Sequence, residues 1–393
     1  MSDCSRDARP ICAQAVVLVG GEGTRLRPIT SRVPKPVVPL VGRPFVGFIL
    51  ENLARHGVSQ AVFSAGYLAH ALEAAIGDGA RYGLSVRYVF EDQPLGTAGA
   101  IRNAEGELGD GCLFAFNGDV LTDVDLSAMI AFHRERGGLA TILLTRVDDP
   151  RRYGLVETAD DGRVLRFLEK PGAEYAVPAH GALINAGVYV LEHEVLAGIV
   201  PGQPSSIERD VFPGLAEAGQ LYAFVGDGYW RDIGTPESYL QAHFDLLQRT
   251  LTTSVAADVG ESYLYVAPDA EVAPGARVVP PAHVAGGTTL GPGARVGPLA
   301  VVGAGCRIGE GAEVVESVLQ DNVTVGVHSR VGRSVVGQQT SVGDDSVVLD
   351  AVVGDGCRIG ADNVVANGCS LFPDTVLPDG SVKFREFDGV EGR

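Results

Sequence analysis

The residues best suited to chemistry follow an apolar run near the start of the printed chain. Residues 16–19 (VVLV) lead into residues 20–23 (GGEG), and Thr24-Arg25 comes next. A strand that ends in a glycine-rich loop can hold a phosphate, because its backbone N–H groups point at the ligand. A Walker loop needs Lys-Ser or Lys-Thr after its last glycine, and a dinucleotide fingerprint needs a third glycine where Leu26 stands. The loop therefore predicts a polyphosphate site of another kind.

Two cations and two acids in the first half of the chain suit such a loop. Arg25 follows the loop directly, and Lys35 stands between two prolines, which lowers the entropy cost of aiming its side chain. Asp119 ends the apolar run FAFNGD, and Asp232 lies in GYWRDIGTP. Mg²⁺ usually takes one or two carboxylates together with phosphate oxygens. The sequence therefore predicts a magnesium site at Asp119 and Asp232.

The elements that must position these residues alternate between strand-like and helix-like stretches from residue 15 to about residue 247. Amphipathic stretches at 45–56 and 68–76 read as helices, and a further helix is predicted from Pro236 onward. This alternation favours an α/β fold with a Rossmann-like, mostly parallel sheet, whose ligands bind beyond the carboxyl ends of the strands. Short buried strands are predicted at residues 16–19, 61–64, 86–89, 113–116 and 141–144.

The second half of the chain has a different repeat. Aliphatic residues fall at every sixth position, with a few five-residue steps, and turn-forming residues fill the gaps. This hexapeptide period predicts a left-handed parallel β-helix of about six triangular coils. The aliphatic series comprises Val266, Val272, Val278, Val284, Leu290, Val296, Val302, Ile308, Val314, Leu319, Val325, Val331, Val336, Val342, Val348, Val353, Ile359, Val365 and Leu371.

The predicted organisation has five parts. They are an N-terminal extension (1–14), an α/β domain (15–249), a linker (250–262), the β-helix (263–385) and a tail (386–393).

The length, composition and net charge of the chain agree with a packed globular protein. They argue against a nucleic-acid-binding, membrane-spanning or metal-binding cysteine protein. The chain has 393 residues, 46% hydrophobic and 20% charged, and a net charge of −18. Such an acidic protein is not expected to bind nucleic acid or an anionic membrane. No apolar run approaches the roughly 18–20 residues of a membrane helix. The six cysteines show no metal-ligand spacing, which favours free thiols in a reducing cytoplasm.

At the level of motifs, the chain resembles the sugar-1-phosphate nucleotidyltransferases over residues 15–247. Seven motifs occur in the family's order: GGEGTRLRPIT, VPKPVVPLVGRP, PLGTAGAI, FNGDV, FLEKP, INAGVYVLE and GYWRDIGTP. A hexapeptide repeat after the catalytic domain also occurs in this family. The stretches SSIERDVFPGLAEAGQLYAF and GYWRDIGTPESYL are most similar to mannose-1-phosphate guanylyltransferases (GDP-mannose pyrophosphorylases).

The resemblance implies a reaction in which a sugar 1-phosphate attacks the α-phosphorus of a nucleoside triphosphate and pyrophosphate leaves. It implies that GTP and mannose 1-phosphate give GDP-mannose, with Mg²⁺ as cofactor. The implied roles are as follows: Arg25, Lys35 and Lys170 in catalysis; Leu18, Gly20, Gly21, Gly23, Thr24, Gln93, Gly96 and Thr97 around the nucleotide; Gly154, Glu169, Lys170, Asn185 and Thr235 around the sugar phosphate; Asp119 and Asp232 on the metal.

Three alternatives remain at this point. Gln93 stands where guanylyltransferases tend to have an acid, and a glutamine there suits pyrimidine recognition, so a glucose-1-phosphate thymidylyl- or uridylyltransferase is one alternative. A catalytically silent subunit that binds a nucleotide sugar is another, although the four charged residues are all present. Acyl transfer by the β-helix is the third, with His283 and His328 in regular coils. The repeat also predicts a homo-oligomer, because an open β-helix favours self-association.

Overall fold

The structure, a computed structural model, describes residues 12–66, 69–169 and 181–383 and contains two compact units. The first unit runs to Glu22 and then takes residues 34–37 and 44–232. The second takes residues 23–33, 38–43 and the chain from Ile233 onward. Two short segments of the N-terminal half are therefore grouped with the C-terminal half.

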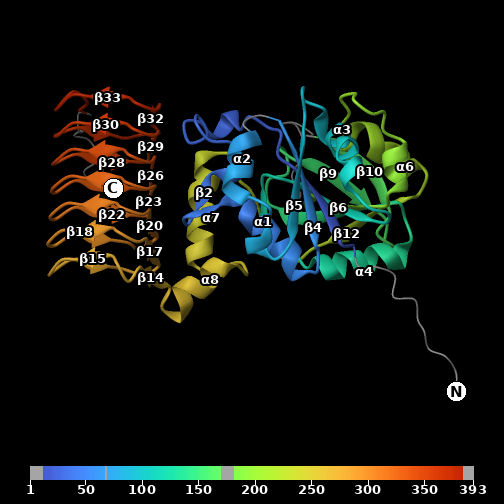
Figure 1. Cartoon of the computed structure of the whole chain (residues 1–393), viewed down its shortest axis with the longest axis horizontal. Helices are drawn as coiled ribbons and strands as arrows, with labels where there is room; N and C mark the ends of the chain where they lie inside the picture. The colour runs from blue at the N-terminus through green and yellow to red at the C-terminus, as the bar shows by residue number, and fades with distance from the viewer. Residues whose placement is uncertain (1–11, 67–68, 170–180, 384–393) are drawn as a thin grey trace, which may run out of the picture. The chain divides into compact units, whose positions relative to one another are not determined.

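The first unit is built on a mixed sheet with nine strands in its described part (Figure 1). The centre is parallel, as predicted, and has the order β6-β1-β4-β5. The remainder is largely antiparallel, because β11 pairs in that sense with β6, β8 and β9, while β12 pairs with β8 in parallel. The strands are β1 (Gln14–Leu18), β4 (Gln60–Ala65), β5 (Ser85–Phe90), β6 (Leu113–Asn117), β8 (Ala140–Val147), β9 (Gly154–Thr158), β10 (Val164–Glu169), β11 (Ala182–Leu191) and β12 (Leu221–Val225).

Helices cover both faces of this sheet. Neighbouring residues of a strand point to opposite faces, so Val17 packs in a core with α1 and α4, whereas Val16 packs in a second core with α3 and α6. The helices are α1 (Phe45–Arg55), α2 (Ala69–Ile76), α3 (Gly96–Asn103), α4 (Leu126–Arg136), α5 (Glu194–Ala197) and α6 (Phe212–Glu217). Shorter turns are η2 (Lys35–Val37), η3 (Ala80–Tyr82), η4 (Glu105–Glu107) and η5 (Ile207–Val211), and a small separate sheet pairs β7 (Val120–Thr122) with β13 (Trp230–Asp232).

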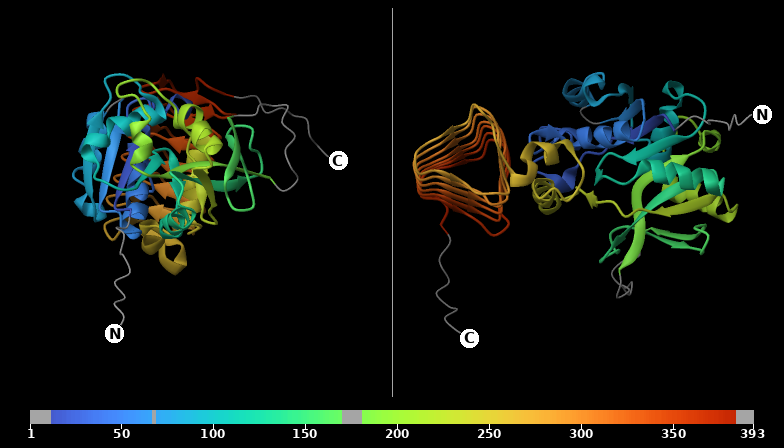
Figure 2. Two further views of the ribbon diagram at one scale, coloured as in Figure 1. Left: turned by 90° about the vertical axis from the view of Figure 1, so that its right-hand side faces the viewer. Right: turned by 90° about the horizontal axis from the view of Figure 1, so that it is seen from below.

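The β-helix of the second unit confirms the six-residue repeat. Its strands form three parallel sheets of seven, seven and six strands in the described part, which corresponds to six full coils and two sides of another (Figure 2). Most of the aliphatic series fills the interior, although Val272 in the first coil is exposed. The first sheet contains β14 (Leu264–Val266), β17 (Ala282–Val284), β20 (Ala300–Val302), β23 (Val318–Leu319), β26 (Val335–Val336), β29 (Val352–Val353) and β32 (Ser370–Leu371).

The other two sheets continue each coil. One contains β15 (Glu271–Val272), β18 (Thr289–Leu290), β21 (Arg307–Ile308), β24 (Thr324–Val325), β27 (Ser341–Val342), β30 (Arg358–Ile359) and β33 (Val376–Leu377). The other contains β16 (Arg277–Val278), β19 (Arg295–Val296), β22 (Glu313–Val315), β25 (Arg330–Gly332), β28 (Val347–Leu349) and β31 (Val364–Val365). The rest of this unit includes η1 (Thr24–Leu26), β2 (Pro39–Leu40), α7 (Pro236–Leu247), α8 (Ser254–Val259) and η6 (Gly260–Ser262), while β3 (Arg43–Pro44) begins in it. The stretch predicted as linker thus holds α8 and η6.

The first sheet of the β-helix is covered on its outer side. Val301, Val318 and Val335 point away from the interior, yet each is at most 3% exposed. Helix α7 lies over this side, because Tyr239 is hydrogen-bonded by Gln320 and also donates to the carbonyl of Pro39. Hydrophobic burial between α7, residues 38–43 and the repeat therefore makes this unit a single packed body.

A pair of histidines lies buried at the same contact. His243 of α7 accepts a hydrogen bond from Val41 N–H over 3.3 Å, and His283 of β17 stacks on Tyr265. Burial lowers the pKa of His243 to about 3, with the neighbouring His283 as a second cause. Burial also lowers the pKa of His283 to about 4. Both imidazoles are therefore neutral in the folded protein at neutral pH.

These histidines predict an acid-sensitive unit. In the unfolded chain a histidine titrates near pH 6.5, whereas in the folded unit both imidazoles stay neutral to a lower pH. The free energy of unfolding of this unit is therefore highest above pH 6.5. It decreases as the pH falls toward 4, by about 1.4 kcal/mol per pH unit for each histidine. We expect the thermal midpoint to drop between pH 6.5 and 4.5, and His283→Gln to flatten this dependence. His328→Gln is the control, because His328 is exposed. An equal slope in both variants would contradict the prediction.

None of the helices in the described ranges combines the length and apolar character that a membrane crossing requires.

Candidate active site

Two loops after neighbouring parallel strands lie in backbone contact in the first unit. Leu18 ends β1, Asn117 ends β6, and the two are register partners. The N–H of Gly118 donates to the Leu18 carbonyl over 2.9 Å, and a Cβ on Gly118 would lie 2.6 Å from that oxygen. Because only glycine permits this approach, Gly118 fixes Asp119 beside the start of the glycine loop.

This contact gives a testable prediction. In Gly118→Ala the new methyl must push the two loops apart, and displacement of reacting groups by about 1 Å costs about 10²-fold in rate. We therefore expect pyrophosphate release to fall by about that factor. Gly106→Ala is the matched control, because Gly106 is exposed and a Cβ added there would meet nothing within 4 Å. Equal activity of the two variants would show that the loop contact does not position the site.

Lys35 joins the two acids that the sequence singled out. Its side chain is 10% exposed, its Nζ donates to Asp119 Oδ2 over 3.0 Å, and Asp232 Oδ1 lies 3.9 Å from the same nitrogen. Asp232 reaches this position because β13 pairs with β7, where Asp232 is the register partner of Val120. The structure therefore brings Lys35, Asp119 and Asp232 together although up to 197 positions separate them.

The two carboxylates fit a hard divalent cation. Oxygen ligands suit Mg²⁺, which is usually held by one or two carboxylates while waters and substrate phosphates fill the remaining positions. In the part of the chain that the structure describes, no group of three or more His, Cys, Asp or Glu side chains is arranged for a metal. A cation here would thus need oxygens from a bound substrate, as expected for a phosphate-transferring site.

A third acid, Glu91, lies beside the glycine loop. Glu91, directly after β5, accepts hydrogen bonds from Ser64 Oγ over 2.9 Å and from Leu95 N–H over 3.0 Å. A Cβ on Gly20 would lie 3.4 Å from the same carboxylate. Glu91 thereby connects the end of β4 with the segment before α3, and its carboxylate limits the space beside Gly20.

The residues assigned to the base lie around the start of α3. Gln93 is exposed in a bend, and Gly96 has a positive φ of 68° with its Cα against the carbonyl of Ser205. Thr97 Oγ1 donates to Glu208 Oε2 over 2.8 Å and accepts from Ile207 N–H. The loop after Pro204 is thus fastened to the helix start.

The residues assigned to the sugar lie on adjoining strands. Gly154 of β9 is the register partner of Glu169 of β10, and β9 pairs with β11 next to Asn185, through Leu155 and Ile184. Asn185 Nδ2 donates to Tyr189 Oη over 2.9 Å. The backbone therefore brings these three positions to one region of the sheet. Lys170 and the side chain of Glu169 lie outside the described residues.

Four assigned residues belong to the second unit. Arg25 lies exposed in η1, and within the described residues it has no hydrogen-bond or ion-pair partner. Thr24 precedes it, and the Gly23 carbonyl accepts from Thr30 Oγ1 over 2.8 Å. Thr235 caps α7 by accepting from Ser238 N–H over 3.3 Å, while its own N–H donates to Ser238 Oγ. Thr235 therefore has a structural task as well as its assigned one.

Comparisons with known proteins agree with this geometry. A model described as nucleotidyl transferase matches residues 14–249, which carry the glycine loop, Lys35, Asp119 and Asp232. The chain belongs to the nucleotidyl transferase family. A second model, described as the GMPPB C-terminal domain, matches residues 278–383 of this nucleotidyl transferase, within the β-helix.

Relatives of this nucleotidyl transferase carry two kinds of name. A mannose-1-phosphate guanylyltransferase of Mycobacterium tuberculosis is 41% identical over 270 residues, which are 67% of this chain and 73% of the relative. A probable mannose-1-phosphate guanylyltransferase 2 of Arabidopsis thaliana is 38% identical over 62% of this chain and 68% of its own. A UTP–glucose-1-phosphate uridylyltransferase of Synechocystis sp. is 36% identical over 61% of this chain and 64% of its own. The solved structure of HddC from Yersinia pseudotuberculosis is 31% identical, with a TM-score of 0.52, and covers 59% of this chain and 98% of that one.

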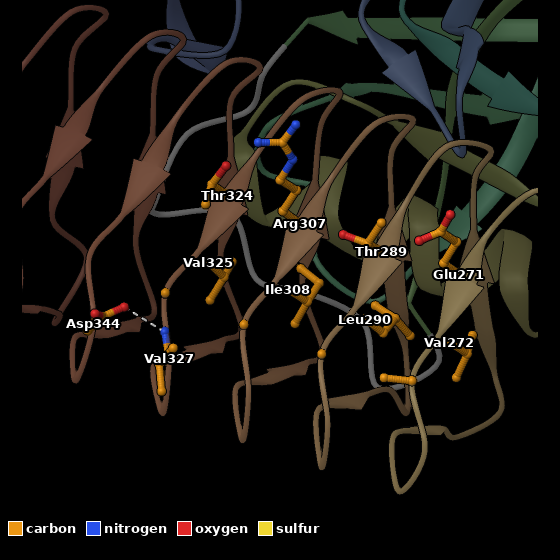
Figure 3. A pocket seen from close by; sticks show the side chains of 14 residues that line it. Glu271, Val272, Thr289, Leu290, Arg307, Ile308, Thr324, Val325, Val327 and Asp344 are labelled. Atoms are coloured by element: carbon orange, nitrogen blue, oxygen red, sulfur yellow. Dashed lines mark hydrogen bonds between the residues drawn. The ribbon is translucent and has the colours of Figure 1, made fainter.

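The β-helix of this nucleotidyl transferase carries a groove lined by its own coils. It has a volume of about 510 Å³, and Glu271, Thr289, Arg307 and Thr324 line it from successive coils (Figure 3). At its far end Asp344 accepts a hydrogen bond from Val327 N–H over 2.7 Å. Its lining holds no histidine, so the groove lacks the base that acyl transfer on a hexapeptide repeat would need.

Sequence reasoning missed two acids of this nucleotidyl transferase, Glu91 and Glu208. Glu91 could have been found, because it lies two residues after a predicted buried strand (86–89) whose carboxyl end faces the ligand side. Glu208 lies in a short π-helical turn, η5, and its partners Thr97 and Tyr189 come from distant segments. No local pattern marks such a residue.

Proposed function

We propose that the protein transfers a guanylyl group from GTP to mannose 1-phosphate, giving GDP-mannose and pyrophosphate. One observation carries the proposal: the buried Lys35 ammonium lies 3.0 Å from Asp119, which follows the central strand β6, and 3.9 Å from Asp232, which ends β13. An anion-binding cation beside two metal-type carboxylates suits phosphoryl chemistry. Relatives named mannose-1-phosphate guanylyltransferase support the choice of substrates.

The reaction needs little from the protein beyond position and charge. The phosphate of the sugar is already ionised at neutral pH, so it attacks the α-phosphorus without a general base, and pyrophosphate leaves in line. Lys35 and Arg25 stabilise the charge that develops on the leaving group, and Lys170 holds the sugar phosphate as a point charge. Bound Mg²⁺ would add electrophilic stabilisation of the phosphate oxygens, with Asp119 and Asp232 as its protein ligands.

The remaining assignments complete the proposed site. Around the nucleotide we place Leu18, Gly20, Gly21, Gly23, Thr24, Gln93, Gly96 and Thr97. Around the sugar and its phosphate we place Gly154, Glu169, Lys170, Asn185 and Thr235. The N–H groups of the glycine loop would hold the triphosphate, since a loop after a buried strand presents its amides to an anion.

The test is pyrophosphate release by the full chain with Mg²⁺, over GTP, UTP, dTTP, CTP and ATP against mannose, glucose, galactose and glucosamine 1-phosphates. A dominant rate with GTP and mannose 1-phosphate supports the proposal. No release with any pair would overturn it and leave a silent nucleotide-sugar-binding subunit.

A second candidate is glucose-1-phosphate uridylyl- or thymidylyl transfer. Gln93 favours it, because a glutamine amide offers both a donor and an acceptor to a pyrimidine edge. The uridylyltransferase of Synechocystis is a relative of comparable identity. In the same assay this candidate predicts a dominant rate with UTP or dTTP and glucose 1-phosphate.

Assembly and compartment form a further part of the proposal. We place the protein in the cytoplasm as a homo-oligomer that associates through the repeat or the domain junction. The described cysteines (Cys12, Cys112, Cys306, Cys357 and Cys369) are free thiols, which supports a reducing compartment. Light scattering of the full chain tests the assembly, and a monomer mass at micromolar concentration would contradict it.

A further inference from the structure

A carboxylate in the first unit is held entirely by hydroxyl groups. Within the described residues, Glu208 accepts hydrogen bonds from Thr97 Oγ1 over 2.8 Å, Ser206 Oγ over 2.7 Å and Tyr189 Oη over 3.2 Å. It is half-buried, and no cation of those residues forms an ion pair with it. Hydrogen bonds to an ionised acceptor are about twice as strong as neutral ones. Glu208 therefore orients all three hydroxyl groups toward itself.

A chain of hydrogen bonds links Glu208 to Asn185, a residue assigned to the sugar, and every bond in it is donated toward Glu208. Asn185 Nδ2 donates to Tyr189 Oη, and Tyr189 Oη donates to Glu208. Asn185 Oδ1 meanwhile accepts from Gly187 N–H over 2.9 Å. The amide of Asn185 is thus held in one orientation, and among the described residues its second N–H and one lone pair of Oδ1 have no hydrogen-bond partner.

The other side of Glu208 leads to the start of α3. Thr97 donates to Glu208 and accepts from Ile207 N–H over 2.8 Å, so its hydroxyl is also fixed in direction. Thr97 follows Gly96, whose backbone is pressed against Ser205. One carboxylate thus connects a residue assigned to the nucleotide, Thr97, with a residue assigned to the sugar, Asn185.

We propose that Glu208 is a positioning residue that couples the sugar side of the site to the nucleotide side, through Tyr189 and Asn185 in one direction and Thr97 in the other. The proposal rests on the proposed function in that both substrates bind this site, with Thr97 on the nucleotide side and Asn185 on the sugar side. It assigns no contact between Glu208 and a substrate. Its consequence is that the orientation of the Asn185 amide, and with it the affinity for the sugar phosphate, depends on an acid 23 positions away in sequence.

Tyr189→Phe tests the chain of hydrogen bonds from Glu208 to Asn185. The ring stays in place against Phe212, where it packs edge-on at 5.1 Å, while the link between Asn185 and Glu208 is lost. We expect KM for the sugar 1-phosphate to rise about tenfold, in line with the loss of one or two hydrogen bonds. KM for the nucleoside triphosphate should stay within about twofold, because the hydrogen bond from Thr97 to Glu208 is intact.

Glu208→Gln tests the carboxylate that joins the two chains of hydrogen bonds. An amide offers one acceptor oxygen in place of a carboxylate's two, so the three hydroxyl donors must compete for it. We expect KM for both substrates to rise, with a sugar effect at least as large as that of Tyr189→Phe. The double variant Glu208→Gln/Tyr189→Phe should add less than twofold on the sugar side, because both changes break the same chain.

Ser206→Ala is the matched control. It removes one of the hydroxyl donors of Glu208 but leaves the chain from Thr97 to Asn185 unbroken. Its KM values should remain within about twofold of those of the unaltered protein. Thermal midpoints of all variants separate positioning from unfolding, since a merely structural role would lower both affinities together with the midpoint.

The kinetics use whichever substrate pair the unaltered protein turns over fastest, so a wrong choice of base or sugar leaves this test intact. If no pair is turned over, calorimetric binding of GTP and of mannose 1-phosphate gives the same comparison. A selective sugar effect of Tyr189→Phe that is absent in Ser206→Ala supports the proposal. Equal effects on both substrates in Tyr189→Phe, or no effect on either, would overturn it.

Discussion

Lys35→Ala should reduce pyrophosphate release by about 10²-fold or more, mainly through kcat. The loss of one preorganised charge at a site of developing negative charge costs about this much. Lys35 is buried and held between Asp119 and Asp232, so its ammonium reaches the reaction without prior rearrangement. The effect should appear in kcat more than in KM, since the charge on the leaving group grows in the transition state.

Two variants make the result specific. Lys35→Arg keeps the charge but not the compact ammonium, so it should recover only part of the rate. Lys383→Ala is the matched control, because Lys383 forms an exposed pair with Asp362 over 3.4 Å on the β-helix. Exposed pairs contribute little, so this variant should keep the original rate. A Lys35→Ala enzyme as active as Lys383→Ala would remove Lys35 from the mechanism.

Asp119→Asn should lower turnover by about 10²- to 10³-fold at a fixed Mg²⁺ concentration, since a metal supplies several kcal/mol of charge stabilisation. The asparagine keeps the shape of the side chain but loses the charge that attracts the cation. We expect the Mg²⁺ concentration for half-maximal rate to rise as well. Asp232→Asn should behave in the same way if both carboxylates serve one cation.

Mg²⁺ binding supplies a second readout besides rate. Titration calorimetry with Mg²⁺ and a saturating non-hydrolysable nucleotide should show weaker binding for Asp119→Asn than for the unaltered protein. Asp362→Asn is the control, because it removes a carboxylate that also pairs with a lysine but lies on the β-helix. Unchanged Mg²⁺ affinity and unchanged rate in Asp119→Asn would show that Asp119 serves only to hold Lys35.

Local patterns were sufficient to predict much of this site. Val16 to Val19 form a buried run before the glycine loop, and Asp119 ends another, so both were placed at strand ends that the structure confirms as adjacent. The pairing of Asp232 with Val120 could not be predicted, because it depends on a small antiparallel sheet formed between distant segments. The six-residue period likewise predicted the β-helix.

The remaining features depend on tertiary contacts. Val301, Val318 and Val335 look like surface positions in the repeat, since they point outward, yet α7 covers them. Glu208 looks like one charge among several in SIERD, and only the fold shows that Thr97 and Tyr189 converge on it. The antiparallel half of the sheet also escaped prediction, because strand direction follows from chain connections rather than from composition.

The segment that carries Arg25 belongs to the same compact unit as the β-helix, where Arg32 of that segment pairs with Asp374 of the last coils. This limits where chimeric proteins can be joined between this chain and its relatives. A chimera joined at residue 250 would exchange the repeat but keep residues 23–33 and 38–43, which would then face foreign partners. A chimera that keeps the packing of this unit must exchange these two segments together with the repeat. The segment that can be exchanged as a whole is therefore discontinuous in sequence. A crossover between the two halves would separate Arg25, the arginine that we propose to hold the triphosphate, from the coils that its segment packs against.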